Sequence, residues 1–127
     1  MINPIIYGKK SDIDSLPSLI NTLNGKIILT GGIFDFMNPH HIDLFDFASS
    51  KGDILIVAVK NNSKHTPFKE RLEILEAFEK IDYLFSYTDI NDIKKIEQLF
   101  DLIISNNEFA FTSDKISFSV KILSFST

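Results

Sequence analysis

Apolar and polar residues alternate along this chain in blocks that predict strands separated by helices. Short runs that are almost wholly apolar, such as residues 54–59, are typical of strands buried on both faces of a parallel sheet. Between these runs, apolar residues recur every three or four positions, which is the spacing of one face of a helix. The predicted strands cover residues 26–30, 54–59, 82–87, 101–104 and 116–124.

Residues that favour helix starts and turns separate these blocks. The predicted helices run from Ser15 to the turn at 24–25, and over 39–48, 67–80 and 90–99. Their starts are marked by residues that cap a helix or open its first turn: Ser15 with Pro17, Asn38 with Pro39, Thr66 with Pro67, and Thr88 or Asp89. Gly31 and Gly32 are expected to break the strand at 26–30.

Strands that alternate with helices imply right-handed crossovers and a parallel sheet with helices on both faces. The sequence therefore predicts an α/β fold, a single Rossmann-like three-layer domain over residues 1–127 with a mainly parallel five-stranded sheet. The strand at 26–30 is expected at its centre. Apolar residues alternate with polar ones in the last strand, so that strand is expected at an edge or antiparallel. Residues 1–10 show no period and predict a loose arm.

The composition narrows the class of protein. A chain of 127 residues is long enough for one domain with a real core, and twelve phenylalanines predict an aromatic-rich core. The net charge of −4 argues against non-specific nucleic-acid binding. The lack of cysteine and of a signal peptide fits a cytoplasmic protein without disulfides. No apolar run approaches the ~20 residues that a membrane helix needs.

A strand, a glycine pair and a helix start follow one another over residues 26–41, and this unit predicts an anion site. In a parallel sheet, ligands bind beyond the carboxyl ends of the strands, where the strand order reverses. A helix N-terminus there offers backbone N–H groups and a positive dipole end to a phosphate. The topology is expected to bring residues 31–41, 60–66 and 105–109 around one cleft.

The residues around the glycines resemble a known signature. Gly32, Phe34, Asp35 and His41 fit the pattern G-x-F-D-x-x-H-x-G-H of the cytidylyltransferase-like nucleotidyltransferases. The resemblance covers most of the chain: residues 101–109 stand where the family has P-D-x-x-V-K-G-x-D-[YW], and residues 124–127 resemble the start of its G-x-S-T-T segment. The branches that look most similar are the adenylyltransferases of ADP-heptose synthesis and the glycerol-3-phosphate cytidylyltransferases.

The resemblance implies a reaction and a set of site residues. It implies transfer of AMP or CMP from ATP or CTP, with Mg²⁺, to a sugar- or polyol-phosphate, with release of pyrophosphate. It implies catalytic roles for His41 and Asn38, acceptor binding by Asp35, and no metal ligands from the protein. It implies nucleotide or phosphate binding by Gly31, Gly32, Ile33, Phe34, Lys64, Arg71, Ser126 and Thr127.

The chain departs from the family pattern at three positions. Asn38 stands in place of the first histidine, His40 in place of a glycine, and Ser105 in place of a lysine. Loss of one transition-state donor typically lowers a rate by about 10²–10³. Two functions are therefore open: a nucleotidyltransferase, or a catalytically degenerate homologue that acts as a nucleotide- or phosphate-binding or protein-interaction module.

Several of these residues also have a plain structural interpretation. Asn38 is at least as well suited to cap a helix as to bind a ligand, and Asp35 could hold its loop instead of facing an acceptor. A basic cluster could bind phosphate or simply be solvated: Lys60, Lys64, His65, Lys69 and Arg71. The expected partners are a nucleoside triphosphate and a phosphorylated small molecule, not nucleic acid or membrane. The excess of phenylalanine also suggests a homodimer.

Overall fold

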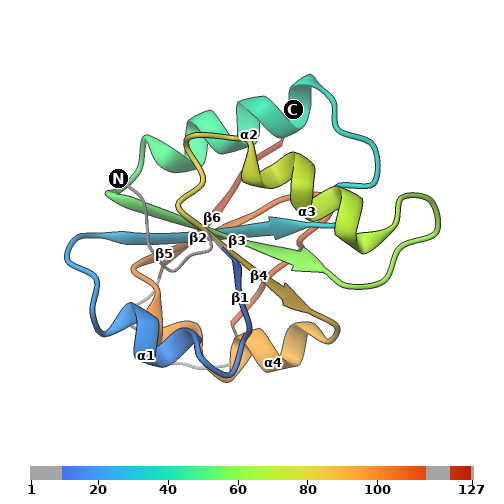
Figure 1. Ribbon diagram of the computed structural model, residues 1–127. Coiled ribbons are helices and arrows are strands. Elements are labelled where there is room, and N and C mark those ends of the chain that lie inside the picture. Colours follow the sequence, from blue (N-terminus) through green and yellow to red (C-terminus); the bar gives the residue numbers. More distant parts are fainter. Residues whose placement is uncertain (1–9, 114–120, 127) are drawn as a thin grey trace.

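A parallel sheet forms the middle layer of the molecule (Figure 1). The computed structural model describes residues 10–113 and 121–126. The sheet has the order β1-β4-β3-β2-β5-β6, and each adjacent pair is parallel. Its strands are β1 (Lys10–Ser11), β2 (Ile27–Gly32), β3 (Ile54–Lys60), β4 (Tyr83–Tyr87), β5 (Leu102–Ser105) and β6 (Lys121–Ser124).

Helices cover both faces of this sheet. In Figure 1, α2 (Pro39–Ser49) and α3 (Phe68–Glu76) lie above it, and α1 (Leu16–Ile20) and α4 (Ile90–Lys94) lie below it. A short 3-10 helix, η2 (Glu97–Leu99), follows α4. The predicted three-layer α/β architecture is therefore confirmed. Within the described ranges, the helices are too short or too polar to cross a membrane.

The central strand is β2, as predicted, and the strand order reverses beside it. Leu29 of β2 pairs with Ile56 of β3 on one side and with Ile103 of β5 on the other. The chain proceeds from β2 to β3 and β4 through α2 and α3, and then returns through α4 to β5. The carboxyl ends of β2 and β5 therefore meet at the switch point, where ligands of such sheets bind.

Two apolar clusters fill the spaces between the layers. One joins the sheet to α1 and α4 and includes Leu16, Ile93 and Phe109. The other joins the sheet to α2 and α3 and includes Phe45 and Leu75. Both clusters use the sheet, because its central strands are apolar on both faces; β3 is buried from Leu55 to Val59.

Two features of the sheet differ from the prediction. The two-residue strand β1 adds a sixth strand at one edge, so Lys10 belongs to the sheet and not to a loose arm. Gly31 and Gly32 do not break β2, because they pair with Ala58 and Val59 of β3. The last strand lies at an edge, which is one of the two predicted possibilities, and it is parallel to β5. Residues 116–120 of the predicted strand lie outside the described ranges, as do residues 1–9.

The helix boundaries also differ in detail. Thr66 does not cap α3, since Pro67 holds the cap position and the Thr66 hydroxyl donates to the backbone oxygen of Asp35. The helix also ends at Glu76 and not near Lys80. The predicted helix at 90–99 is divided into α4 and η2, and Asp89 caps it by accepting from the N–H of Asn91. Ser15 bonds to Asp12 and makes no cap hydrogen bond to α1.

Candidate functional site

The backbone that follows β2 turns sharply at Ile33 and Phe34. We call these two residues the anion-binding corner, because their N–H groups bind a carboxylate. Phe34 has a φ of 58°, in the left-handed region that non-glycine residues seldom adopt. Its side chain is buried and packs edge-on against the His41 ring, with the ring centroids 5.1 Å apart. This packing holds the strained conformation, in which the successive N–H groups of Ile33 and Phe34 converge on one oxygen atom.

That oxygen belongs to the Glu108 carboxylate, which comes from the loop after β5. Glu108 Oε1 accepts hydrogen bonds from the N–H of Ile33 at 3.0 Å and of Phe34 at 2.9 Å. Its other oxygen, Oε2, lies 3.0 Å from His41 Nε2. An acidic side chain of the protein thus engages the backbone donors and the histidine that the sequence predicted for phosphate.

The first turn of α2 fixes the orientation of His41. The Asn38 side chain caps the helix by accepting from the His40 N–H at 2.9 Å. The His41 ring reaches back, and its Nδ1 accepts from the Asn38 N–H at 3.2 Å. Because Nδ1 acts as an acceptor, the hydrogen-bond network places the ring proton on Nε2. The Nε2–H group then donates a hydrogen bond to Glu108.

The charge of Glu108 is strongly stabilised in this position. The hydrogen bond from His41 is the largest cause that lowers the pKa of Glu108 to about 2, and the backbone N–H bonds of Phe34 and Ile33 add to it against the opposing effect of burial. Burial raises the pKa of Tyr87 to about 12, and the negative charge of Glu108 contributes. The Glu108 carboxylate is therefore ionised over the whole physiological pH range.

A tight turn carries Glu108 into place. Asn106 and Phe109 exchange backbone hydrogen bonds at 2.9 and 3.0 Å, which closes the four-residue turn. The Asn106 side chain accepts from the Glu108 N–H and donates to the backbone oxygen of Gly31 at 3.0 Å. These contacts join the loop after β5 to the end of β2.

The glycine pair makes room for this loop. A Cβ atom on Gly31 would lie 2.7 Å from Phe109 Cδ1 and 2.8 Å from the Ala58 oxygen. A Cβ atom on Gly32 would lie 3.0 Å from Glu108 Oε1. The glycines are therefore needed for close approach of the loop, and not for a turn of the backbone.

Asp35 joins the loop after β2 to the loop after β3. Its carboxylate accepts from the Ser63 hydroxyl and from the Thr66 N–H, the latter at 3.1 Å. The hydrogen bond from Ser63 is the main cause that lowers the pKa of Asp35. In this structure Asp35 holds the loop, which is the structural one of the two roles considered from the sequence.

Arg71 of α3 is buried beneath the same two loops. Its guanidinium donates to the backbone oxygens of Ile33, Lys60, Asn61 and Thr66 at 2.7–3.0 Å. The side chain is only 2% exposed. Its place is thus below the site, where it ties the anion-binding corner to the neighbouring loop.

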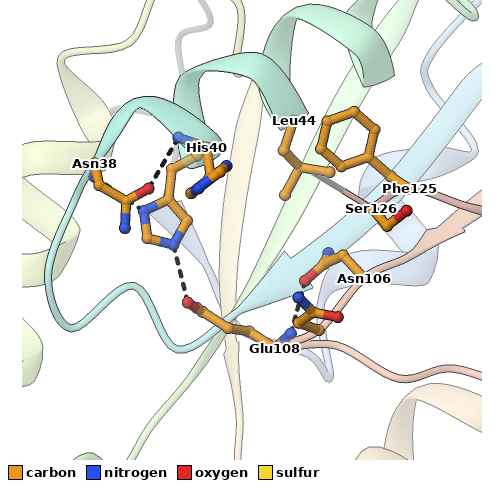
Figure 2. A pocket seen from close by; sticks show the side chains of 9 residues that line it. Asn38, His40, Leu44, Asn106, Glu108, Phe125 and Ser126 are labelled. Atoms are coloured by element: carbon orange, nitrogen blue, oxygen red, sulfur yellow. Dashed lines mark hydrogen bonds and ion pairs between the residues drawn. The ribbon is translucent and has the colours of Figure 1, made fainter.

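A pocket opens beside Glu108, between the start of α2 and the end of β6 (Figure 2). It has a volume of about 130 Å³. Polar residues of three segments line it, which are Asn38, His40, His41, Asn106, Asn107, Glu108 and Ser126, together with Leu44 and Phe125. The structure therefore brings the predicted residue Ser126 into one pocket with Asn38 and His41, from which it is far apart in the sequence.

A second, more open cleft lies on the other side of Glu108. It has a volume of about 560 Å³ and lies over the ends of β3 and β4. The residues that line it are Ile33, Lys60, Tyr87, Thr88, Asp89, Ile90, Glu108, Phe109 and Ala110. Glu108 and its loop thus separate two hollows at the switch point.

The remaining predicted residues lie elsewhere. Lys64 is exposed on the loop after β3 and lines neither hollow. His65 lies beside the exposed ring of Phe36, with the ring centroids 5.0 Å apart. Thr127 falls outside the described residues. Among the described residues, no three His, Cys, Asp or Glu side chains are grouped so that they could hold a metal ion.

The sequence interpretation missed Glu108, Asn106 and Ser63. Glu108 occupies the position of the acidic residue in the family pattern over 101–109, so its position gave a signal that it faces the cleft. No comparable signal singles out Asn106 or Ser63 within the ranges 105–109 and 60–66 expected around the cleft, because each acts through a contact with a distant segment.

The cytidylyltransferase-like family model matches residues 29–116, which span the glycine pair, α2 and the Glu108 loop. This chain belongs to the cytidylyltransferase-like family of nucleotidyltransferases. It is similar to the bifunctional protein HldE of Desulfatibacillum aliphaticivorans, with 30% identity over 71% of this chain and 22% of that protein. It is also similar to HldE of Haemophilus influenzae strain PittEE, with 27% identity over 66% of this chain and 20% of that protein. The chain thus spans about a fifth of the length of these relatives.

Two solved structures share the fold. A lipopolysaccharide core biosynthesis protein from Thermoplasma volcanium matches with a TM-score of 0.67 and 21% identity, over 81% of this chain and 98% of that chain. A pantoate-beta-alanine ligase from Francisella tularensis, complexed with beta-gamma ATP and beta-alanine, matches with a TM-score of 0.67 and 16% identity. That match covers 94% of this chain and 67% of the ligase. At these identities the likeness concerns the fold alone.

Proposed function

We propose that this chain binds the phosphates of ATP or CTP at the switch point and transfers AMP or CMP to a sugar- or polyol-phosphate, releasing pyrophosphate at a rate far below that of an ordinary transferase. The observation that carries this proposal is the convergence of the Ile33 and Phe34 N–H groups with His41 Nε2 on one anion. Those donors match the needs of a phosphate oxygen.

Each site residue would have a defined task in this reaction. The Ile33 and Phe34 N–H groups and His41 would hold a phosphate group and stabilise the charge that develops on the departing pyrophosphate. Asn38 would position His41 through the helix cap, and Ser126 would add a hydroxyl from the opposite wall of the pocket. Asp35 and Arg71 would keep the corner rigid and would not contact the nucleotide.

Mg²⁺ fits this site as the partner of the nucleotide. Mg²⁺ usually binds through substrate phosphates and one or two carboxylates, and it keeps several waters. The described residues offer no group of three metal ligands, so the ion would enter together with the triphosphate. When bound, it would neutralise part of the phosphate charge.

We expect a low rate because this site has few cationic side chains to stabilise the charge on the departing pyrophosphate. Asn38, His40 and Ser105 differ from the residues of the family pattern. Backbone N–H donors do not depend on these side chains, so we expect weak phosphate binding despite the three differences. Catalysis does depend on them, since charge on the pyrophosphate requires several cations at once. We expect a nucleotide affinity no better than about millimolar, or ~4 kcal/mol.

The test is binding of ATP and CTP with Mg²⁺, followed by pyrophosphate release across a panel of sugar phosphates. His41→Ala should abolish binding, whereas Asn38→His combined with His40→Gly should improve it. A brisk reaction of the unchanged protein would contradict the expected low rate. A complete lack of nucleotide binding, before and after the two substitutions, would contradict the proposed function.

A degenerate homologue without turnover is the second candidate function. It is favoured by the structural tasks of two predicted site residues, since Asn38 caps α2 and Arg71 bonds to four backbone oxygens. Nucleotide binding without pyrophosphate release from any sugar phosphate would favour this candidate.

A further inference from the structure

The Glu108 carboxylate occupies the place at which the backbone corner and His41 would hold a ligand anion. Both backbone N–H groups donate to its Oε1, and His41 Nε2 lies 3.0 Å from its Oε2. Each backbone N–H has one proton to donate, and His41 Nδ1 is already engaged by the Asn38 N–H. The donors of this corner are therefore engaged by a single side chain of the protein.

A phosphate cannot share these donors with Glu108. It would need the same N–H protons, and its negative charge would lie against the negative charge of the carboxylate. Gly32 reinforces the exclusion, because its missing Cβ is what lets Glu108 Oε1 approach the backbone closely. Ligand binding in this corner therefore requires the carboxylate to leave.

We propose that Glu108 is a built-in competitor: the free protein closes its anion site with its own carboxylate, and a phosphate-bearing ligand binds by displacing it. This inference rests on the proposed function only for the nature of the ligand, a phosphate group of a nucleotide. The displaced group is a monoanion. A di- or polyanion such as pyrophosphate therefore gains more at this corner than another carboxylate would.

The surrounding structure indicates how the carboxylate leaves. The backbone of its turn is held by the Asn106–Phe109 hydrogen bonds and by the Asn106 contact to Gly31, so the movement falls on the torsions of the Glu108 side chain. Glu108 lines both hollows of the site. Among the described residues that line the larger one, Lys60 is the basic residue, and we assign it as the partner of the displaced carboxylate.

The test compares pyrophosphate binding to the wild type, Glu108→Ala and Glu108→Gln, with Glu73→Gln as a control. Glu73 is an exposed acidic residue of α3, so its substitution changes the net charge by the same amount. Titrations followed by the amide NMR signals of Ile33 and Phe34 report binding at the corner itself. We expect at least about tenfold tighter binding by the Glu108 variants, and a change within about twofold for the control.

Equal or weaker binding by folded Glu108 variants would overturn the inference, as would a lack of pyrophosphate binding in all variants. Glu108→Gln keeps the size of the side chain and carries the test if Glu108→Ala does not fold. Lys60→Gln should weaken binding in the wild type but not in Glu108→Ala. An equal loss in both backgrounds would overturn the assignment of Lys60.

The inference and the proposed function fail in distinguishable ways. If the Glu108 variants bind pyrophosphate more tightly but no variant binds ATP or CTP, the inference stands and the proposed function falls. If the wild type releases pyrophosphate from ATP or CTP while the Glu108 variants bind no tighter, the function stands and the inference falls.

Discussion

At the scale of single residues, Arg71 shows how burial decides the task of a charged side chain. Its guanidinium carries several N–H donors in one plane, and they bond to four backbone oxygens: one in the loop after β2, one at the end of β3 and two in the loop after β3. Each of these oxygens would lose a charge-assisted hydrogen bond if the guanidinium group were removed. Arg71 thus sets the relative position of the anion-binding corner and the loop after β3.

Arg71→Lys should lower the free energy of unfolding by about 2–4 kcal/mol, because a single ammonium cannot bond to all four oxygens. Urea unfolding at neutral pH measures the change as a shift of the midpoint at constant slope. Lys69→Ala, an exposed substitution on the same helix, should stay within about 0.5 kcal/mol. Equal stability of Arg71→Lys and Lys69→Ala would contradict the structural role of Arg71.

Glu108 should make the stability of the protein depend on acidity. Its pKa is about 2 in the folded state, below the ordinary 4.5, so its contribution is complete above pH 4.5 and is lost as the pH falls toward 2. Since 35% of the side chain is exposed, solvent screening reduces the contribution to about 1–2 kcal/mol.

The measurement is the difference in unfolding free energy between the wild type and Glu108→Gln as a function of pH. The difference should be constant above pH 4.5 and shrink below it. Glu73→Gln provides the comparison at matched charge. A wild type that keeps its full advantage over Glu108→Gln at pH 2 would show that the His41 and backbone contacts do not stabilise the ionised carboxylate.

At the scale of elements, the start of α2 combines a helix cap with the site. Asn38 accepts from the His40 N–H through its side-chain oxygen, and aspartate can do the same. We expect Asn38→Ala to lower the unfolding free energy by about 1 kcal/mol and Asn38→Asp to leave it nearly unchanged. Thermal or urea unfolding of the two variants measures this difference. An equal loss in both would mean that the side-chain amide matters for more than the cap.

The end of β2 depends on the absence of a side chain. In Gly31→Ala the new methyl group would press on the Phe109 ring and on the Ala58 oxygen, both under 3 Å away. Overpacking of this kind costs about 1–3 kcal/mol. Urea unfolding should show the loss, and the amide NMR signals of the 106–109 turn should shift. An unperturbed turn in a fully stable Gly31→Ala variant would contradict the close packing.

At the scale of the whole molecule, the structure removes the argument from phenylalanine content for a homodimer. Many of the phenylalanines fill the core, including Phe34, Phe45, Phe85, Phe100, Phe109 and Phe111, so their number is explained without a partner. Exposed apolar side chains occur on the edge strand β6 at Ile122 and Leu123. The homodimer stays a prediction, and sedimentation at tens of micromolar tests it on the scale of ~10⁻⁵ M where weak dimers form. A clean monomer would contradict it.

The sequence by itself determined most of the elements and the layers in which they lie, but not the short strand β1. An apolar run such as 54–59 is typical of a strand buried on both faces, and the Asn38-Pro39 pair specifies a helix start through local hydrogen bonds and a fixed φ. The helix start is a short-range effect, so the placement of His41 in the first turn of α2 could be predicted. The central position of β2 was predicted from the alternation of strands and helices. The resemblance to the family signature added the expectation of an anion site at the end of β2.

Only the tertiary structure decided which group each polar side chain would meet. Arg71 bonds to Ile33 across 38 positions of the sequence, and Glu108 reaches Ile33 across 75 positions and His41 across 67. No local pattern encodes such a contact, because it exists only once β5 has paired beside β2 and the sheet has brought their carboxyl ends together. The chain thus specifies the corner of backbone donors locally, and the fold then brings the protein's own carboxylate against them.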